Sequence, residues 1–93
     1  MKISFFAYYR DADYAGCREA EFPAPKDLRG LGTELGARYG EKFRTEFFSP
    51  DESVLGEKII VLINGRRAEF LQGLDTPLKD SDHIRIFPIV AGG

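Results

Sequence analysis

Hydrophobic and polar positions in the first 22 residues predict two short strands. Residues 1–9 (MKISFFAYY) alternate roughly between a more apolar and a more polar face, and Phe6 lies on the polar one. Residues 10–16 have the composition of a turn, and residues 18–22 alternate again. Pro23 ends this segment, because proline cannot donate a hydrogen bond to a sheet ladder. The pattern predicts an N-terminal β-hairpin.

An apolar stripe in the middle of the chain predicts one helix. Its members recur at three- and four-residue spacing: Leu28, Leu31, Leu35, Tyr39 and Phe43. Asp27 or the step at residues 25–26 is a suitable start. Each of Gly30, Gly32 and Gly36 costs a helix about 1 kcal/mol relative to alanine. We therefore expect packing to hold the helix, with a close approach to a sheet as the reason for these glycines.

The second half of the chain predicts a loop at residues 47–57 and then another hairpin. The run IIVLI at residues 59–63 is typical of a strand that is buried on both faces. Asn64-Gly65 favours a type I′ turn, which needs positive φ at both positions. Residues 66–70 are then the returning strand, and residues 76–77 favour one turn of tight helix.

Residues 83–90 are the last predicted strand, with Ile84 and Ile86 on one face. A strand that begins the chain and a strand that ends it can pair in parallel at the centre of a sheet, with the helix as the crossover. This order predicts an α+β fold of the β-grasp type, a mixed sheet with one main helix packed on one face. We expect residues 1–90 to form the domain and residues 91–93 to form a flexible tail.

Composition supports a single small domain. The chain has 93 residues, 43% hydrophobic residues and a formal net charge of -2, with no long basic run that would indicate a nucleic-acid partner. No apolar stretch approaches the roughly 20 residues of a membrane helix, and the start of the sequence does not have the pattern of a signal peptide. A single cysteine excludes an internal disulfide. We expect a soluble, cytoplasmic protein.

Few residues suggest intrinsic chemistry. His83 is the only histidine and Cys17 the only cysteine, so a histidine-based triad or a metal cluster would lack partners. The acidic pairs are predicted to lie in turns, where aspartate commonly bonds to the backbone. No phosphate-binding loop occurs in the sequence. We therefore expect no catalytic residue, no metal site and no bound cofactor in this chain.

The last two positions, Gly92 and Gly93, are the exception. Two glycines would occupy both positions in only about 1% of chains with this glycine content. Without a Cβ, such a tail can pass through a narrow channel of a partner. A free carboxylate is ionised at pH 7 and is a poor acyl donor, so it would need activation by ATP bound to another protein. The residues alone leave open whether the glycines have this role or are incidental.

Three segments resemble the ubiquitin-like sulfur carriers, most closely the MoaD-like family, the small subunit of molybdopterin synthase. They are TPLKDSDHIRIFPIVAGG at residues 76–93, KISFFAYYR at residues 2–10 and VLINGR at residues 61–66. With the helix between them, the resemblance covers nearly the whole chain. It implies a ubiquitin-like fold and a carrier that is not itself an enzyme.

The resemblance also implies a reaction cycle and its partners. An adenylating enzyme uses ATP to join AMP to the carboxylate of Gly93, and a sulfur donor converts the product to a thiocarboxylate. The tail of Ala91, Gly92 and Gly93 then enters the large subunit of molybdopterin synthase and gives its sulfur to a pterin precursor. Phe6 and Phe87 match positions that contribute to the family's docking surface.

Three other functions remain open at this point. The chain could carry sulfur for another pathway, such as the thiazole of thiamine, although those carriers resemble it less. It could modify proteins by forming isopeptide bonds through Gly93, or it could be a binding module in which the glycines are incidental. Neighbouring genes distinguish the two carrier pathways, and Gly-Gly remnants on lysines of other proteins would indicate a modifier. The sequence does not specify molybdenum or tungsten.

Overall fold

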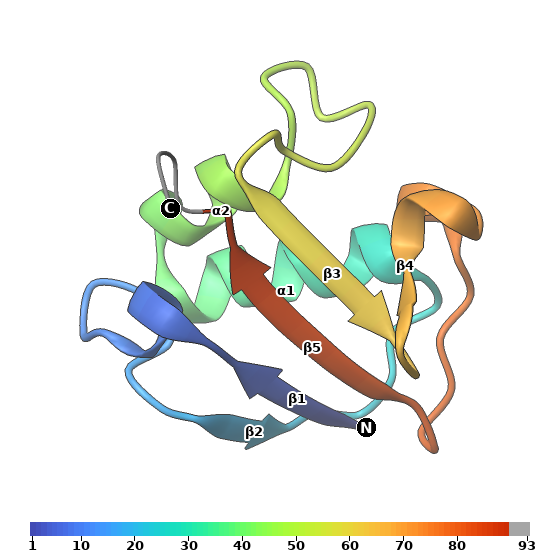
Figure 1. Ribbon diagram of the computed structural model, residues 1–93, viewed down its shortest axis with the longest axis horizontal. Coiled ribbons are helices and arrows are strands. Elements are labelled where there is room, and N and C mark those ends of the chain that lie inside the picture. Colours follow the sequence, from blue (N-terminus) through green and yellow to red (C-terminus); the bar gives the residue numbers. More distant parts are fainter. Residues whose placement is uncertain (90–93) are drawn as a thin grey trace.

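The computed structural model describes residues 1–89 and shows a sheet with its helices packed on one face (Figure 1). The five strands lie in the order β2-β1-β5-β3-β4. In chain order the elements are β1 (Lys2–Phe5), the 3-10 helix η1 (Ala7–Arg10), β2 (Glu19–Glu21), α1 (Leu28–Tyr39), α2 (Glu41–Phe47), β3 (Ile59–Ile63), β4 (Arg66–Arg67), the 3-10 helices η2 (Ala68–Phe70) and η3 (Gly73–Asp75), and β5 (His83–Pro88).

The first and last strands pair in parallel at the centre of the sheet. Ile3 of β1 lies opposite Ile84 of β5, and Phe5 lies opposite Ile86. The other three strand pairs are antiparallel, so the sheet is mixed. The predicted α+β architecture and the predicted parallel pairing are therefore confirmed.

The core lies between the sheet and the helices. Its largest fully buried side chains come from β1, β3, β5, η1 and both helices: Ile3, Phe5, Tyr9, Leu28, Leu31, Leu35, Phe43, Phe47, Val61, Ile84 and Ile86. The alternation in β5 places Ile84 and Ile86 in this core and leaves His83 and Arg85 on the open face. Strand periodicity thus assigned the two faces of β5 correctly.

The helical region differs from the prediction of one helix. Gly40 adopts a φ of 111°, which glycine reaches without a steric cost, and it separates α1 from α2. Phe43 therefore belongs to the second helix, although it is buried as the apolar stripe requires. The start at Asp27 is confirmed, because its carboxylate accepts a hydrogen bond of 2.9 Å from the amide of Gly30.

The reason for two of the helical glycines also differs from the prediction. Gly32 lies against the rings of Phe47 and Phe48, at the end of α2, and Gly36 lies against the side chain of Arg44 in α2. The close approach is therefore between two helices and not between a helix and the sheet. The prediction that these glycines approach the sheet was wrong, because it treated α2 as a continuation of α1.

The second hairpin matches the prediction at its turn and differs from the prediction in its strands. Asn64 and Gly65 have φ values of 52° and 86°, as a type I′ turn requires. The run at residues 59–63 is fully buried on one face only, because Ile60 and Leu62 are half-exposed on the open face of the sheet. The returning strand contains only two residues and continues into η2.

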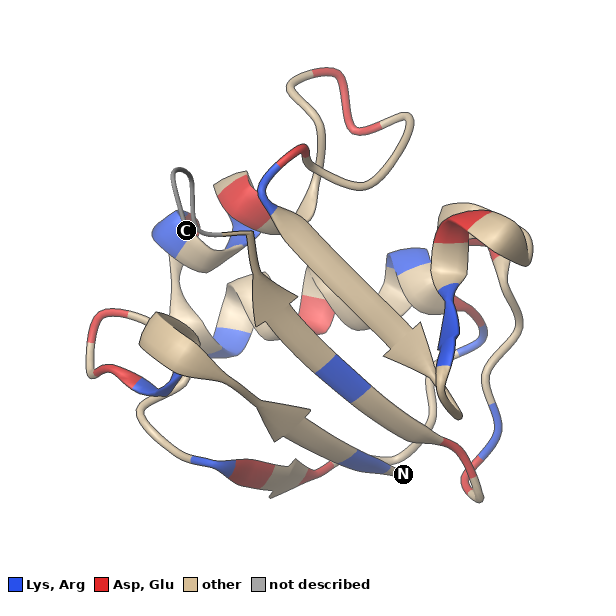
Figure 2. Ribbon diagram, viewed as in Figure 1, with Lys and Arg blue, Asp and Glu red and all other residues tan. Residues whose placement is uncertain are grey.

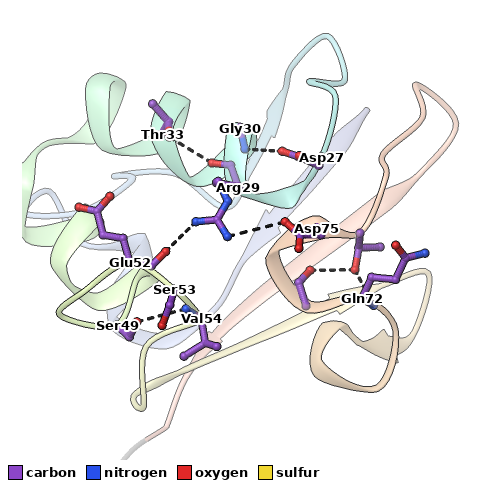
Figure 3. A network of polar contacts seen from close by, with 12 residues as sticks. Asp27, Arg29, Gly30, Thr33, Ser49, Glu52, Ser53, Val54, Gln72 and Asp75 are labelled. Carbon is purple, nitrogen blue, oxygen red and sulfur yellow. Dashed lines mark hydrogen bonds and ion pairs between the residues drawn. The ribbon is translucent and has the colours of Figure 1, made fainter.

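The tight helical turn predicted at residues 76–77 forms three residues earlier, as η3. The long loop after α2 is tied to α1 and η3 through Arg29 (Figure 3). The guanidinium group of Arg29 donates to the carbonyl of Glu52 at 2.6 Å and lies 3.7 Å from the carboxylate of Asp75. This contact fixes the loop against the first turn of α1.

We predict that Gly32→Ala destabilises the fold. Alanine is the better helix former by about 1 kcal/mol, but its Cβ would overlap the buried ring of Phe47 and lie 2.7 Å from Cζ of Phe48. Overpacking of this kind costs about 1–3 kcal/mol and should outweigh the gain. Gly30→Ala is the control, because its Cβ would lie 3.2 Å from Pro25. Denaturant unfolding compares the two, and a Gly32→Ala variant as stable as the native chain would contradict the packing described.

Candidate functional site

The ends of β1 and β5 bring Phe6 and Phe87 together. The parallel register places Phe5 beside Ile86, and the amide of Phe6 donates to the carbonyl of Ile86 at 3.1 Å. The two rings stack with centroids 4.2 Å apart and planes 9° from parallel. Both side chains are half-exposed on the open face. We call this pair the aromatic stack; its role in docking stays a prediction.

The aromatic stack belongs to a wider apolar strip. Ile60 lies opposite Phe87 in the register of β3 and β5 and is half-exposed beside it. The charged residues of the strands are basic on β1 and β5, acidic on β2 and absent from β3 (Figure 2). The open face thus combines exposed aromatic surface with positive charge along its two central strands. Such a combination is typical of surfaces that bind other proteins.

Ile89 follows β5 directly and is the last residue that the structure describes. Its amide donates to the carbonyl of Lys58 at 2.6 Å, which extends the pairing of β5 with β3 by one step. Its side chain is 44% exposed. Ala91, Gly92 and Gly93, the residues predicted to present and carry the sulfur, lie outside the described residues, as does Val90 at the end of the predicted last strand.

A cluster of three tyrosines and one glutamate holds the segment that follows Phe6 in the sequence. Tyr8 and Tyr9 donate to Oε1 of Glu46 at 2.6 and 3.0 Å, and Tyr14 donates to Oε2. Glu46 lies on α2, so these bonds fasten η1 and the turn after it to the second helix. We call these four residues the tyrosine clamp.

The tyrosine clamp favours an ionised Glu46. Burial alone would raise the pKa of this carboxyl, but the hydrogen bonds from Tyr14, Tyr8 and Tyr9, together with the charge of Lys58, hold it below its usual value. On the donor side, burial and then the hydrogen bond to Glu46 raise the pKa of Tyr8 to about 12. The carboxylate and the phenols therefore keep complementary protonation states throughout the neutral range.

His83 and Cys17 have ordinary structural surroundings. Nε2 of His83 lies 2.8 Å from Oγ of Ser4, and burial followed by the nearby charges of Arg85 and Lys2 lowers the histidine pKa. Cys17 is half-buried at the edge of the core. Within residues 1–89, no group of three histidine, cysteine or acidic side chains could hold a metal ion. The helices of the described chain include none that is long and apolar enough to cross a membrane.

This mixed sheet with its helices on one face is a ubiquitin-like β-grasp. The chain belongs to the ThiS family, whose family model matches residues 3–93. It is a ubiquitin-like sulfur carrier of the ThiS and MoaD type, and small carriers of this type are generally not catalysts. No curated protein matches the chain significantly.

Three solved structures illustrate the range of its relatives. Small archaeal modifier protein 1 from Methanosarcina acetivorans is 32% identical with a TM-score of 0.80, covering 99% of this chain and 94% of its own. A Pyrococcus furiosus protein described as molybdopterin converting factor, subunit 1, is 29% identical with a TM-score of 0.65, covering 96% and 95%. CysO in the BexX/CysO complex of Amycolatopsis orientalis is 24% identical with a TM-score of 0.80, covering 99% and 98%, and supports the fold alone.

We predict that the tyrosine clamp makes folding stability sensitive to acid. A carboxyl whose pKa is lowered by folding stabilises the folded state at pH values above its ordinary pKa, and this contribution is lost as the pH falls through the folded value. The free energy of unfolding should therefore fall more steeply below pH 5 in the native chain than in Glu46→Gln. One proton contributes at most about 1.4 kcal/mol per pH unit to this slope.

Glu57→Gln is the control for this measurement, because Glu57 is exposed and makes no hydrogen bond within the described chain. Urea unfolding at a series of pH values compares the three proteins. If Glu46→Gln and Glu57→Gln change the slope equally, the tyrosine clamp does not hold the carboxyl in its ionised form.

Proposed function

We propose that this chain is the small subunit of molybdopterin synthase and carries sulfur as a thiocarboxylate on Gly93. The observation that carries the proposal is the aromatic stack at the end of β5. Three residues separate Ile89 from the last glycine, so a partner that binds the stack could receive the tail in the same encounter. The Pyrococcus furiosus relative, described as a molybdopterin converting factor, supports this pathway.

The chemistry needs two partners and a sulfur donor. The carboxylate of Gly93 attacks the α-phosphorus of ATP in an adenylating enzyme and releases pyrophosphate. Sulfide supplied by the donor then displaces AMP and leaves a thiocarboxylate. In the large synthase subunit the sulfur passes to the pterin precursor, and water returns the carboxylate. This chain supplies the docking surface and the tail, while ATP and the pterin bind to its partners.

A protein modifier is the second candidate, because the relative with 32% identity is a small archaeal modifier protein. Activation of Gly93 would be the same, but a lysine amine would replace sulfide as the nucleophile and form an isopeptide bond. Thiocarboxylated chain mixed with the large subunit and the pterin precursor tests the first function. Lysines bearing a Gly-Gly remnant in the proteome of the host, absent when the gene is deleted, would support the second.

We predict that Phe87→Ala weakens the complex with the large synthase subunit more than it weakens the fold. Truncation of an aromatic anchor at the centre of an interface typically costs about 2 kcal/mol or more in binding, whereas the half-exposed Phe87 makes a smaller contribution to the core. Titration calorimetry and thermal unfolding measure the two effects. Unchanged binding with a large fall in the melting temperature would show that Phe87 serves the fold and not docking.

Deletion of Gly93 should leave stability almost unchanged and abolish sulfur transfer. Glycine has no side chain to bury, so the fold loses little. The reacting carbonyl would begin one residue earlier, a shift of about 3.8 Å, whereas reacting atoms must meet within about 3–3.5 Å. A second variant, with one alanine added after Gly93, should be equally inactive. Pterin conversion by the shortened chain at the native rate would contradict the assignment of Gly93.

A further inference from the structure

The segment that follows the aromatic stack is held in a strained conformation. Ala7 adopts a φ of 53°, in the left-handed region that costs residues other than glycine about 1–2 kcal/mol. Ala7 is exposed, so its own packing does not explain this conformation. Strain of this kind persists only where the surroundings impose it, and it often accompanies a functional requirement.

Two sets of contacts impose the conformation. The tyrosine clamp holds Tyr8 and Tyr9 of η1 against Glu46. Within the turn, the amide of Tyr9 donates to the carbonyl of Phe6 at 3.2 Å. The chain therefore reverses immediately after Phe6, and η1 directs Arg10 back toward the end of β1.

The reversal fixes the side chain of Arg10 beside the aromatic stack. Its Nε donates to the carbonyl of Phe5 at 2.8 Å, and its Cζ lies 5.3 Å from the centroid of the Phe6 ring. An arginine side chain offers five N–H donors. Only Nε is used here, and the two terminal nitrogens form no hydrogen bond or ion pair with any other described residue.

The free donors of Arg10 border a hollow of about 450 Å³ on the open face of the sheet. Its lining residues are Ser4, Phe5, Phe6, Arg10, Arg18 and Glu19. Glu19 is paired with Lys2 at 3.1 Å, whereas Arg18 forms no ion pair within the part of the chain that the structure describes. Among residues 1–89, the hollow is therefore lined by two guanidinium groups without an ion pair and by one carboxylate that is already paired with Lys2.

We propose that Arg10 is a pre-oriented anchor that binds an aspartate or glutamate side chain of the adenylating enzyme when that enzyme docks on the aromatic stack. This inference rests on the proposed activation of Gly93 and adds the charge that the partner must present. An arginine can hold a carboxylate with two parallel hydrogen bonds. Because contacts to Phe5 and Phe6 already restrict this side chain, it loses less conformational entropy on binding than a free surface arginine.

The experiment compares substitutions of Arg10 with one of Arg38. Arg38 is also an arginine above an aromatic ring, with Cζ 5.0 Å from the centroid of Phe22, but it lies on α1 and not on the open face. Titration calorimetry measures the dissociation constant for the adenylating enzyme in the presence of ATP. We expect Arg10→Met to bind at least about tenfold more weakly, a loss typical of a central interface arginine. Arg38→Met should bind as the native chain does.

Two further measurements separate an anchor from a purely structural role. Arg10→Lys keeps the charge but loses the planar pair of donors, so its affinity should fall between those of Arg10→Met and the native chain. The salt dependence of binding should be weaker in Arg10→Met than in the native chain, because an ion pair is lost. A structural role would lower the melting temperature of Arg10→Met and leave the salt dependence unchanged, and this result would overturn the proposal.

Failure of this proposal can be distinguished from failure of the proposed function. If Phe87→Ala weakens binding to the adenylating enzyme and Arg10→Met does not, Arg10 is not an anchor. The proposed activation of Gly93 is then unaffected. If the native chain releases no pyrophosphate with the adenylating enzyme and ATP, the proposed function itself fails. If both variants bind the adenylating enzyme with native affinity, this enzyme does not dock on the aromatic stack.

Discussion

The parallel pairing of β1 with β5 is the constraint on which the rest of the structure depends. It brings together two strands separated by almost the whole chain, and the connection between them must cross one face of the sheet. The helices that cover this face complete the core, and the opposite face stays open. The same register stacks Phe6 on Phe87, and Phe87 lies six positions before the predicted carrier glycine. One pairing thus determines the core, the position of the proposed docking surface and the edge of the sheet at which β5 ends.

Local patterns in the sequence predicted much of this arrangement. Alternation identified both faces of β5, and Asn64-Gly65 identified the turn between β3 and β4. Alternation also identified β1, but the strand predicted over residues 1–9 ends at Phe5, because the chain reverses there into η1. Parallel pairing then followed from the order of the elements, and with it the proximity of Phe6 and Phe87. The break at Gly40 was missed because the apolar stripe continues through it to Phe43, and periodicity cannot distinguish one helix from two that bury the same face.

The tyrosine clamp could not be predicted in this way. Its three donors lie 32 to 38 residues before Glu46 in the chain, and no periodicity relates a turn to a helix at such a distance. The clamp nevertheless connects the fold to the proposed function, since it holds the strained segment that follows Phe6 and fixes the position of Arg10. Positive φ at Ala7 was equally hidden, because alanine has no intrinsic preference for that region.

The central claim is that this rigid domain presents a terminal glycine for activation and receives sulfur on it. The most direct test is the intact mass of the native chain after incubation with ATP, the adenylating enzyme and a sulfur donor. The account predicts a gain equal to the difference between one sulfur and one oxygen atom, which fragmentation places at Gly93. An unchanged mass while ATP is consumed, or a sulfur atom located on Cys17, would contradict it.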